Sequence, residues 1–136
     1  MTDIQTAINR LNGHSICLVK GEDIIVLDDR GIKPIMELIG QGADLSGYSV
    51  CDKIVGKAAA MLFNKLGIIA VHALVISTKA LLYLKDNGIE CTFDLQVDTI
   101  INRKGDGMCP MEQTVESIDD YEEAYNSLKT KLASMR

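Results

Sequence analysis

Residues 49–66 read SVCDKIVGKAAAMLFNKL, and almost every position of this run is apolar or small. A helix that is apolar on all sides is normally buried, and Ala58–Ala60 would let it pack closely against a sheet. The start of the run is polar, and Ser49 and Asp52 resemble a capping box in which Asp replaces the usual Glu or Gln. We therefore predict one buried helix over the whole run, with Cys51, Asp52 and Lys53 in its first turn.

The segment before this run predicts a helix followed by a hairpin. Asp3–Leu11 has the spacing of a short amphipathic helix. Ser15–Lys20 and Ile24–Asp28 are two apolar runs joined by three residues, a spacing typical of an antiparallel hairpin. A short helix with Pro34 near its first position then leads toward the central run.

The segment after the run predicts strands that alternate with helices. Ile68–Ile76 is apolar apart from His72, which is typical of a central strand covered on both faces. A helix over Thr78–Asp86 separates it from a second strand, Cys91–Val97, and a right-handed crossover makes the two strands parallel neighbours. Ile118–Ala133 predicts a charged outer helix. The pattern predicts an α/β fold, namely a three-layer α/β/α sandwich with a mixed sheet.

Length and composition indicate one domain over residues 1–136. The net charge of −5 and the isoelectric point near 4.9 argue against nucleic acid or an anionic membrane as partner. No apolar run reaches the roughly 18 residues of a membrane span. The first residues lack the apolar core of a signal peptide, so we expect a cytoplasmic protein. Its four cysteines form no C-x-x-C pair and are expected to be reduced thiols.

Ligands of such sheets bind at the carboxyl ends of the strands, beside the starts of the following helices. Three predicted helix starts are therefore candidates for one cleft, those at Ser49–Lys53, Ser77–Lys79 and Cys109–Glu112. Arg103 follows the last strand and offers a planar, permanently charged group that suits phosphate or carboxylate.

Cys109 stands just before Pro110, at a predicted N-cap where Ser, Thr, Asp or Asn would stabilise the helix more. The ionised form of a thiol is favoured at a helix start and beside Lys or Arg. Cys109 is therefore either a reactive thiol or a partly exposed structural cysteine. For Cys51 the structural reading leads, because thiols in buried elements are common.

Two motifs carry a resemblance to known proteins. They are DKIVGKAAA at residues 52–60, and Asn102-Arg103 followed by Cys109-Pro110-Met111-Glu112. On these the chain is identified as a member of an uncharacterised prokaryotic family, domain of unknown function eighteen ninety-three. The order of its elements resembles the cytidine-deaminase-like fold. That resemblance implies catalytic groups at helix starts and a homo-oligomer.

The same resemblance does not imply zinc chemistry. Zinc deaminases carry H-x-E or C-x-E at one helix start and P-C-x-x-C at the next. Here the first place reads Cys51-Asp52-Lys53, with Lys53 where the catalytic Glu would stand, and the second reads Ser77-Thr78-Lys79-Ala80. We expect no zinc and no other cofactor. Cys51, Cys109 and His72 are the residues that could converge on a metal, but a His in a buried strand is usually a satisfied core residue.

Our leading hypothesis is a domain that binds a small polar or nucleotide-like molecule, and whether it is an enzyme stays open. As an enzyme it would be a zinc-independent hydrolase or transferase, with Cys109 as nucleophile and Asp52 or Glu112 as proton carrier. The alternatives are a non-catalytic binding or regulatory domain, and a redox sensor that pairs Cys51 with Cys109. The residues expected to contact the ligand are Cys51, Lys53, Lys57, Ser77, Thr78, Asn102 and Arg103.

Overall fold

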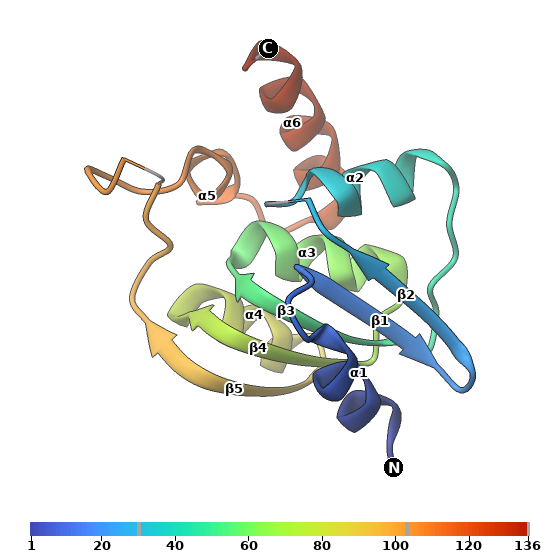
Figure 1. Ribbon diagram of the computed structural model, residues 1–136. Helices are drawn as coiled ribbons and strands as arrows, with labels where there is room; N and C mark the ends of the chain where they lie inside the picture. The colour runs from blue at the N-terminus through green and yellow to red at the C-terminus, as the bar shows by residue number, and fades with distance from the viewer. Residues whose placement is uncertain (30, 103, 136) are drawn as a thin grey trace.

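The computed structural model describes residues 1–29, 31–102 and 104–135. Within these residues five strands form one mixed sheet, and six helices cover its two faces (Figure 1). The strands are β1 (Ile16–Lys20), β2 (Asp23–Leu27), β3 (Ser49–Val55), β4 (Ala70–Ser77) and β5 (Glu90–Val97). The helices are α1 (Asp3–Leu11), α2 (Lys33–Gly40), α3 (Lys57–Leu66), α4 (Thr78–Asp86), α5 (Pro110–Val115) and α6 (Tyr121–Ser134).

The sheet has the order β2-β1-β3-β4-β5. β1 and β2 form the predicted antiparallel hairpin, and β1 also pairs antiparallel with β3. β3, β4 and β5 run parallel to one another, which confirms the prediction that β4 and β5 are parallel neighbours. The carboxyl ends of these three strands therefore lie at one edge of the sheet.

The prediction of one helix over residues 49–66 is wrong. Ser49–Val55 is strand β3, Gly56 is extended at φ −99° and ψ −179°, and the helix begins at Lys57. A continuous apolar run fits a strand buried between two neighbours as well as it fits a buried helix, so apolar content alone could not separate them. The β-branched Val50, Ile54 and Val55 favour the strand.

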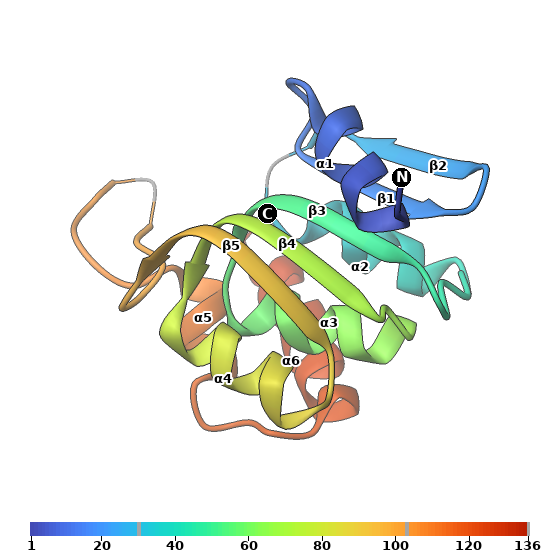
Figure 2. The same ribbon diagram turned by 90° about the horizontal axis from the view of Figure 1, so that it is seen from below.

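The two faces of the sheet carry unequal layers (Figure 2). α1 packs on one face, and the other helices lie on the opposite face. The main core lies on the second face and includes buried side chains of β1, β3 and β4 and of α2 to α6, with Ile25 and Leu27 of β2 packed against it. A smaller cluster lies under α1 and consists of Ala7, Leu11, Cys17, Val19 and Cys51. The α/β fold with three layers is as predicted.

His72 is a satisfied core residue, as expected. It lies in β4 with 8% of its surface exposed. Its Nδ1 is 2.7 Å from Thr92 Oγ1 and its Nε2 is 3.2 Å from Asp94 Oδ1, so both ring nitrogens have partners on β5. In the described ranges, no helix combines the length and the apolar character needed to cross a membrane.

Candidate functional site

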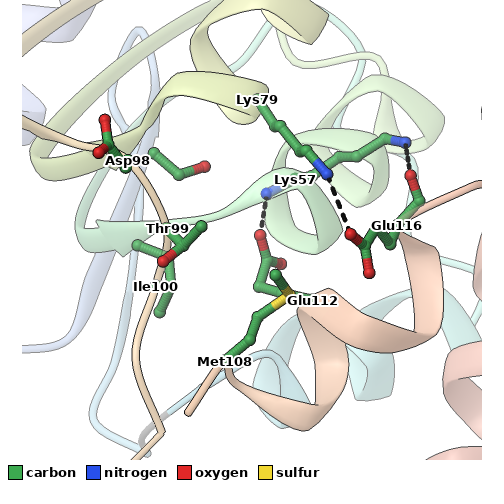
Figure 3. A pocket seen from close by; sticks show the side chains of 9 residues that line it. Lys57, Lys79, Asp98, Thr99, Ile100, Met108, Glu112 and Glu116 are labelled. Atoms are coloured by element: carbon green, nitrogen blue, oxygen red, sulfur yellow. Dashed lines mark hydrogen bonds and ion pairs between the residues drawn. The ribbon is translucent and has the colours of Figure 1, made fainter. Parts of the chain in front are cut away.

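A crevice lies where the three parallel strands end (Figure 3). Its walls come from the starts of α3 and α4, from the segment after β5, and from α5. Most of its roughly 280 Å³ of space is open to solvent, and the enclosed part, about 10 Å³, has room for about one water molecule. A larger ligand would therefore lie across the mouth of the crevice. The lining residues are Lys57, Ser77, Lys79, Asp98, Thr99, Ile100, Met108, Glu112 and Glu116.

The start of α3 is capped by a carboxylate from α5. Glu112 accepts hydrogen bonds from the backbone N–H of Lys57 at 2.7 Å and of Ala58 at 2.9 Å. These N–H groups belong to the first turn of α3, which has no partner for them within the helix. A Cβ on Gly56 would lie 2.4 Å from Glu112 Cδ, so only glycine leaves room for this carboxylate.

The Lys57 ammonium group joins α3 to the end of α5. Its Nζ donates to the carbonyl oxygens of Val115 at 3.0 Å and Glu116 at 3.3 Å, and lies 3.5 Å from Asp119 Oδ1. The Lys57 side chain is only 10% exposed. These carbonyls end a helix and otherwise need partners, so the contacts of Lys57 are structural.

The start of α4 carries hydroxyl groups and one half-exposed ion pair. Ser77 is the buried N-cap, and its Oγ accepts from Ala80 N–H at 3.1 Å. Thr78 Oγ1 donates to the Val97 carbonyl at 3.3 Å, which ties α4 to β5. Lys79 Nζ lies 3.5 Å from Glu116 Oε1, and these side chains are 49% and 53% exposed. Lys79 and Glu116 therefore remain accessible to a ligand.

The start of α5 confirms that Cys109 is the N-cap of a helix, as the sequence predicted. Pro110 is the first residue of this helix, but no hydrogen bond from the cap side chain is present. Cys109 is partly buried against the main core, its backbone N–H donates to the Ile100 carbonyl at 2.9 Å, and it is not among the residues that line the crevice. Glu112, which was predicted to share a site with Cys109, does line the crevice.

The segment between β5 and α5 forms a small hairpin closed by the bridge between Ile101 and Met108. Asn102 is engaged inside it: its Nδ2 donates to Asp106 Oδ1 at 2.8 Å, and its Oδ1 accepts from Asp106 N–H at 3.2 Å. Arg103, a predicted ligand contact, lies outside the described residues.

Cys51, Asp52 and Lys53 are not at a helix start, because they belong to strand β3. Cys51 is fully buried under α1 opposite Cys17, and burial raises the pKa of its thiol to about 12. Asp52 is 8% exposed, and burial raises the pKa of its carboxyl group to about 7. Lys53 is exposed on the strand, and none of the three lines the crevice.

The pairing of Cys51 with Cys109 is not supported. Cys51 belongs to the cluster under α1, whereas Cys109 packs against the main core on the opposite face of the sheet. No three His, Cys, Asp or Glu side chains of the described residues are placed together to hold a metal ion. Zinc needs thiolate, imidazole or carboxylate ligands. The crevice has the carboxylates of Asp98, Glu112 and Glu116. However, Glu112 caps α3, Glu116 pairs with Lys79, and the three do not gather around one point.

Sequence reasoning missed three polar residues of the crevice, namely Asp98, Thr99 and Glu116. Asp98 and Thr99 directly follow β5, as Thr78 directly follows β4, so their place after a parallel strand was the signal for them. Lys79 belonged to the predicted helix start Ser77–Lys79, but only Ser77 and Thr78 of that start were expected to contact the ligand. Glu116 comes from the end of α5, and no local pattern in the sequence points to it.

Comparison with known proteins gives one family and no function. Residues 5–132 match the family described as Domain of unknown function (DUF1893). The chain belongs to this family. A DUF1893 family protein from Thermotoga maritima has a similar crystal structure, with a TM-score of 0.87 and 31% sequence identity over 96% of this chain and 91% of that chain. No curated protein matches the DUF1893 chain.

Proposed function

We propose that this DUF1893 chain is a non-catalytic domain that binds a small polar molecule across the mouth of the crevice, at the carboxyl ends of β3, β4 and β5. One observation carries the proposal. The start of α4 and the end of α5 bring Lys79 and Glu116 to the mouth of the crevice, and both side chains stay about half-exposed. The thiol of Cys109 is not part of the lining.

The polar groups of the crevice suggest a ligand of low net charge. Lys57 and Glu112 are occupied by contacts within the protein, which leaves Lys79, Asp98 and Glu116 as charged groups for a ligand. One cation and two carboxylates favour a molecule that offers both hydrogen-bond donors and acceptors, such as a nucleoside or a zwitterion. A phosphate group would meet more negative than positive charge there.

Calorimetric titration with nucleosides, their 5′-monophosphates and free amino acids tests this proposal. We expect binding of a nucleoside or amino acid, and weaker binding of the monophosphate. Lys79→Ala and Glu116→Gln should each weaken binding by about tenfold, the loss of one hydrogen bond to a charged group. Their own effect on stability should be small, because an exposed ion pair contributes less than about 1 kcal/mol.

Lys85→Ala is the matched control. Lys85 lies in the last turn of α4, on the same helix as Lys79 but at the end away from the crevice. Its replacement should leave binding unchanged. The absence of binding to any of these compounds would contradict the proposal, as would binding that Lys79→Ala and Glu116→Gln leave intact.

The enzymatic alternative rests on Cys109, because its side chain makes no capping hydrogen bond and lies at a helix start. As a nucleophile it should react with iodoacetamide faster than Cys91, which is also partly buried. Equal rates for the two thiols would leave the alternative without support. We propose no zinc step, and the deaminase-like relationship and the cytoplasmic location remain predictions from the sequence.

A further inference from the structure

β5 is the edge of the sheet, and its outer side is open. The strand order ends at β5 within the described residues, and Figures 1 and 2 show it at the rim of the sheet. The five consecutive residues 92–96 are all exposed, among them Phe93 and Leu95 at 38% and 56%. Edge strands are usually protected by Pro, by charged side chains, above all Lys, or by being short. β5 has eight residues, ECTFDLQV, without Pro or Lys, and its two carboxylates, Glu90 and Asp94, lie on the face opposite Phe93 and Leu95.

The backbone of β5 offers hydrogen-bonding groups at this edge. Glu90 N–H donates to the Ile69 carbonyl at 3.2 Å, so the backbone groups of Glu90 point toward β4. Because this direction alternates along a strand, the N–H and C=O groups of Cys91 and Phe93 point outward. These are the groups that an added strand would pair with.

A second copy of the same strand matches this edge in one register. Residues whose backbone N–H and C=O groups point outward must lie opposite residues of the same kind in the second copy. A twofold axis centred on Phe93 satisfies this condition. Phe93 then faces Phe93 of the second copy, and Cys91 faces Leu95. On the other face of the sheet Thr92 faces Asp94, and Glu90 faces Gln96.

The other antiparallel registers are worse. An axis centred on Asp94 would place two carboxylates opposite each other, and an axis centred on Thr92 would place Glu90 opposite Asp94. Like charges directly opposite each other are destabilising. An axis centred on Leu95 avoids this but pairs only residues 93–97 of the strand, whereas the axis on Phe93 pairs residues 90–96.

We propose that the protein forms a twofold-symmetric dimer by antiparallel pairing of β5 with β5 of a second copy, centred on Phe93. The two sheets then form one continuous sheet of ten strands. Apolar side chains meet apolar ones on the α4 face, polar side chains meet polar ones on the α1 face, and no like charges lie opposite each other. The dimer is independent of any ligand in the crevice.

Sedimentation equilibrium tests the assembly. We expect the unmodified chain to be a dimer of about 29.8 kDa, twice the 14.9 kDa of one chain. Phe93→Asp places two carboxylates at the axis and should raise the dimer dissociation constant by about 100-fold or more. Ile54→Asp is the control, because Ile54 is 55% exposed on β3, two strands away from the edge. A monomeric unmodified chain, or equal dissociation of both variants, would overturn the proposal.

Disulfide trapping tests the register and does not depend on whether Phe93→Asp folds. With oxidised glutathione as oxidant, two thiols form one disulfide, and glutathione takes up the two electrons and two protons. Phe93→Cys should give a covalent dimer, and Ile54→Cys should not. Leu95→Cys should cross-link to the native Cys91, and Cys91→Ser should abolish that link. Cross-linking of Leu95→Cys that survives Cys91→Ser, or equal cross-linking of Ile54→Cys, would overturn the register.

Discussion

Asp52 is a buried carboxyl group that makes stability depend on pH. Burial raises its pKa from 3.8 to about 7 in the folded protein. Backbone hydrogen bonds from Ile54, whose N–H lies 3.4 Å from Oδ1, and from Lys53 favour the charged form, but burial outweighs them. Between about pH 4 and pH 7 the folded state keeps a proton that the unfolded state has lost. The free energy of unfolding therefore falls as the pH rises through this range.

The variant Asp52→Asn removes this titration. Each pKa unit is worth about 1.4 kcal/mol, so the fall between pH 4 and pH 8 should be smaller in the variant by up to roughly 4 kcal/mol. Urea unfolding across that range measures it, with Asp106→Asn on the exposed hairpin as control. Parallel curves for Asp52→Asn and the unmodified chain would show that Asp52 is ionised in the fold.

At the scale of the elements, the contact between α5 and the start of α3 has the sharpest consequence. Glu112→Ala removes two hydrogen bonds to the first turn of α3 and should lower the free energy of unfolding by about 1–3 kcal/mol. Glu116→Ala, four residues along and half-exposed, should cost less than about 1 kcal/mol. Urea unfolding of both variants gives the comparison.

Gly56→Ala should act through the same carboxylate. The backbone of Gly56 is extended, so alanine meets no strain of its own, but its Cβ would displace Glu112. The cost of Gly56→Ala should therefore largely disappear in the Glu112→Ala background, a coupling that a double-mutant cycle measures. Additive losses would mean that Gly56 and Glu112 act independently.

At the scale of the whole molecule, the sequence predicts a single domain. The main core contains side chains from β1 to α6, including Ile16 and Leu128, so the elements share one interior. Thermal unfolding should therefore follow one transition, with the same midpoint by circular dichroism at 222 nm and by fluorescence of the four tyrosines at a fixed protein concentration. Two separate midpoints would contradict the prediction.

Local sequence patterns determined much of the fold. The helix Asp3–Leu11, the hairpin of β1 and β2, and the parallel pair β4 and β5 follow from side-chain periodicity and turn residues, which act over a few positions. Parallel strands also place their carboxyl ends at one edge. For that reason the sequence predicted the edge that holds the crevice, with Ser77 and Glu112 among its residues. Lys57 was predicted as a ligand contact only because it lies one turn beyond Lys53 on the wrongly predicted helix.

Tertiary structure decided the rest, because it depends on which segments lie across from one another. Residues 49–66 are apolar both as a central strand and as a buried helix, and only their neighbours β1 and β4 make Ser49–Val55 a strand. Because Ser49–Val55 is a strand and not part of the helix, Cys51 lies under α1 and the helix begins at Lys57. The pairing of Glu112 with the start of α3, and of Lys57 with the end of α5, joins residues more than fifty positions apart, beyond any local pattern.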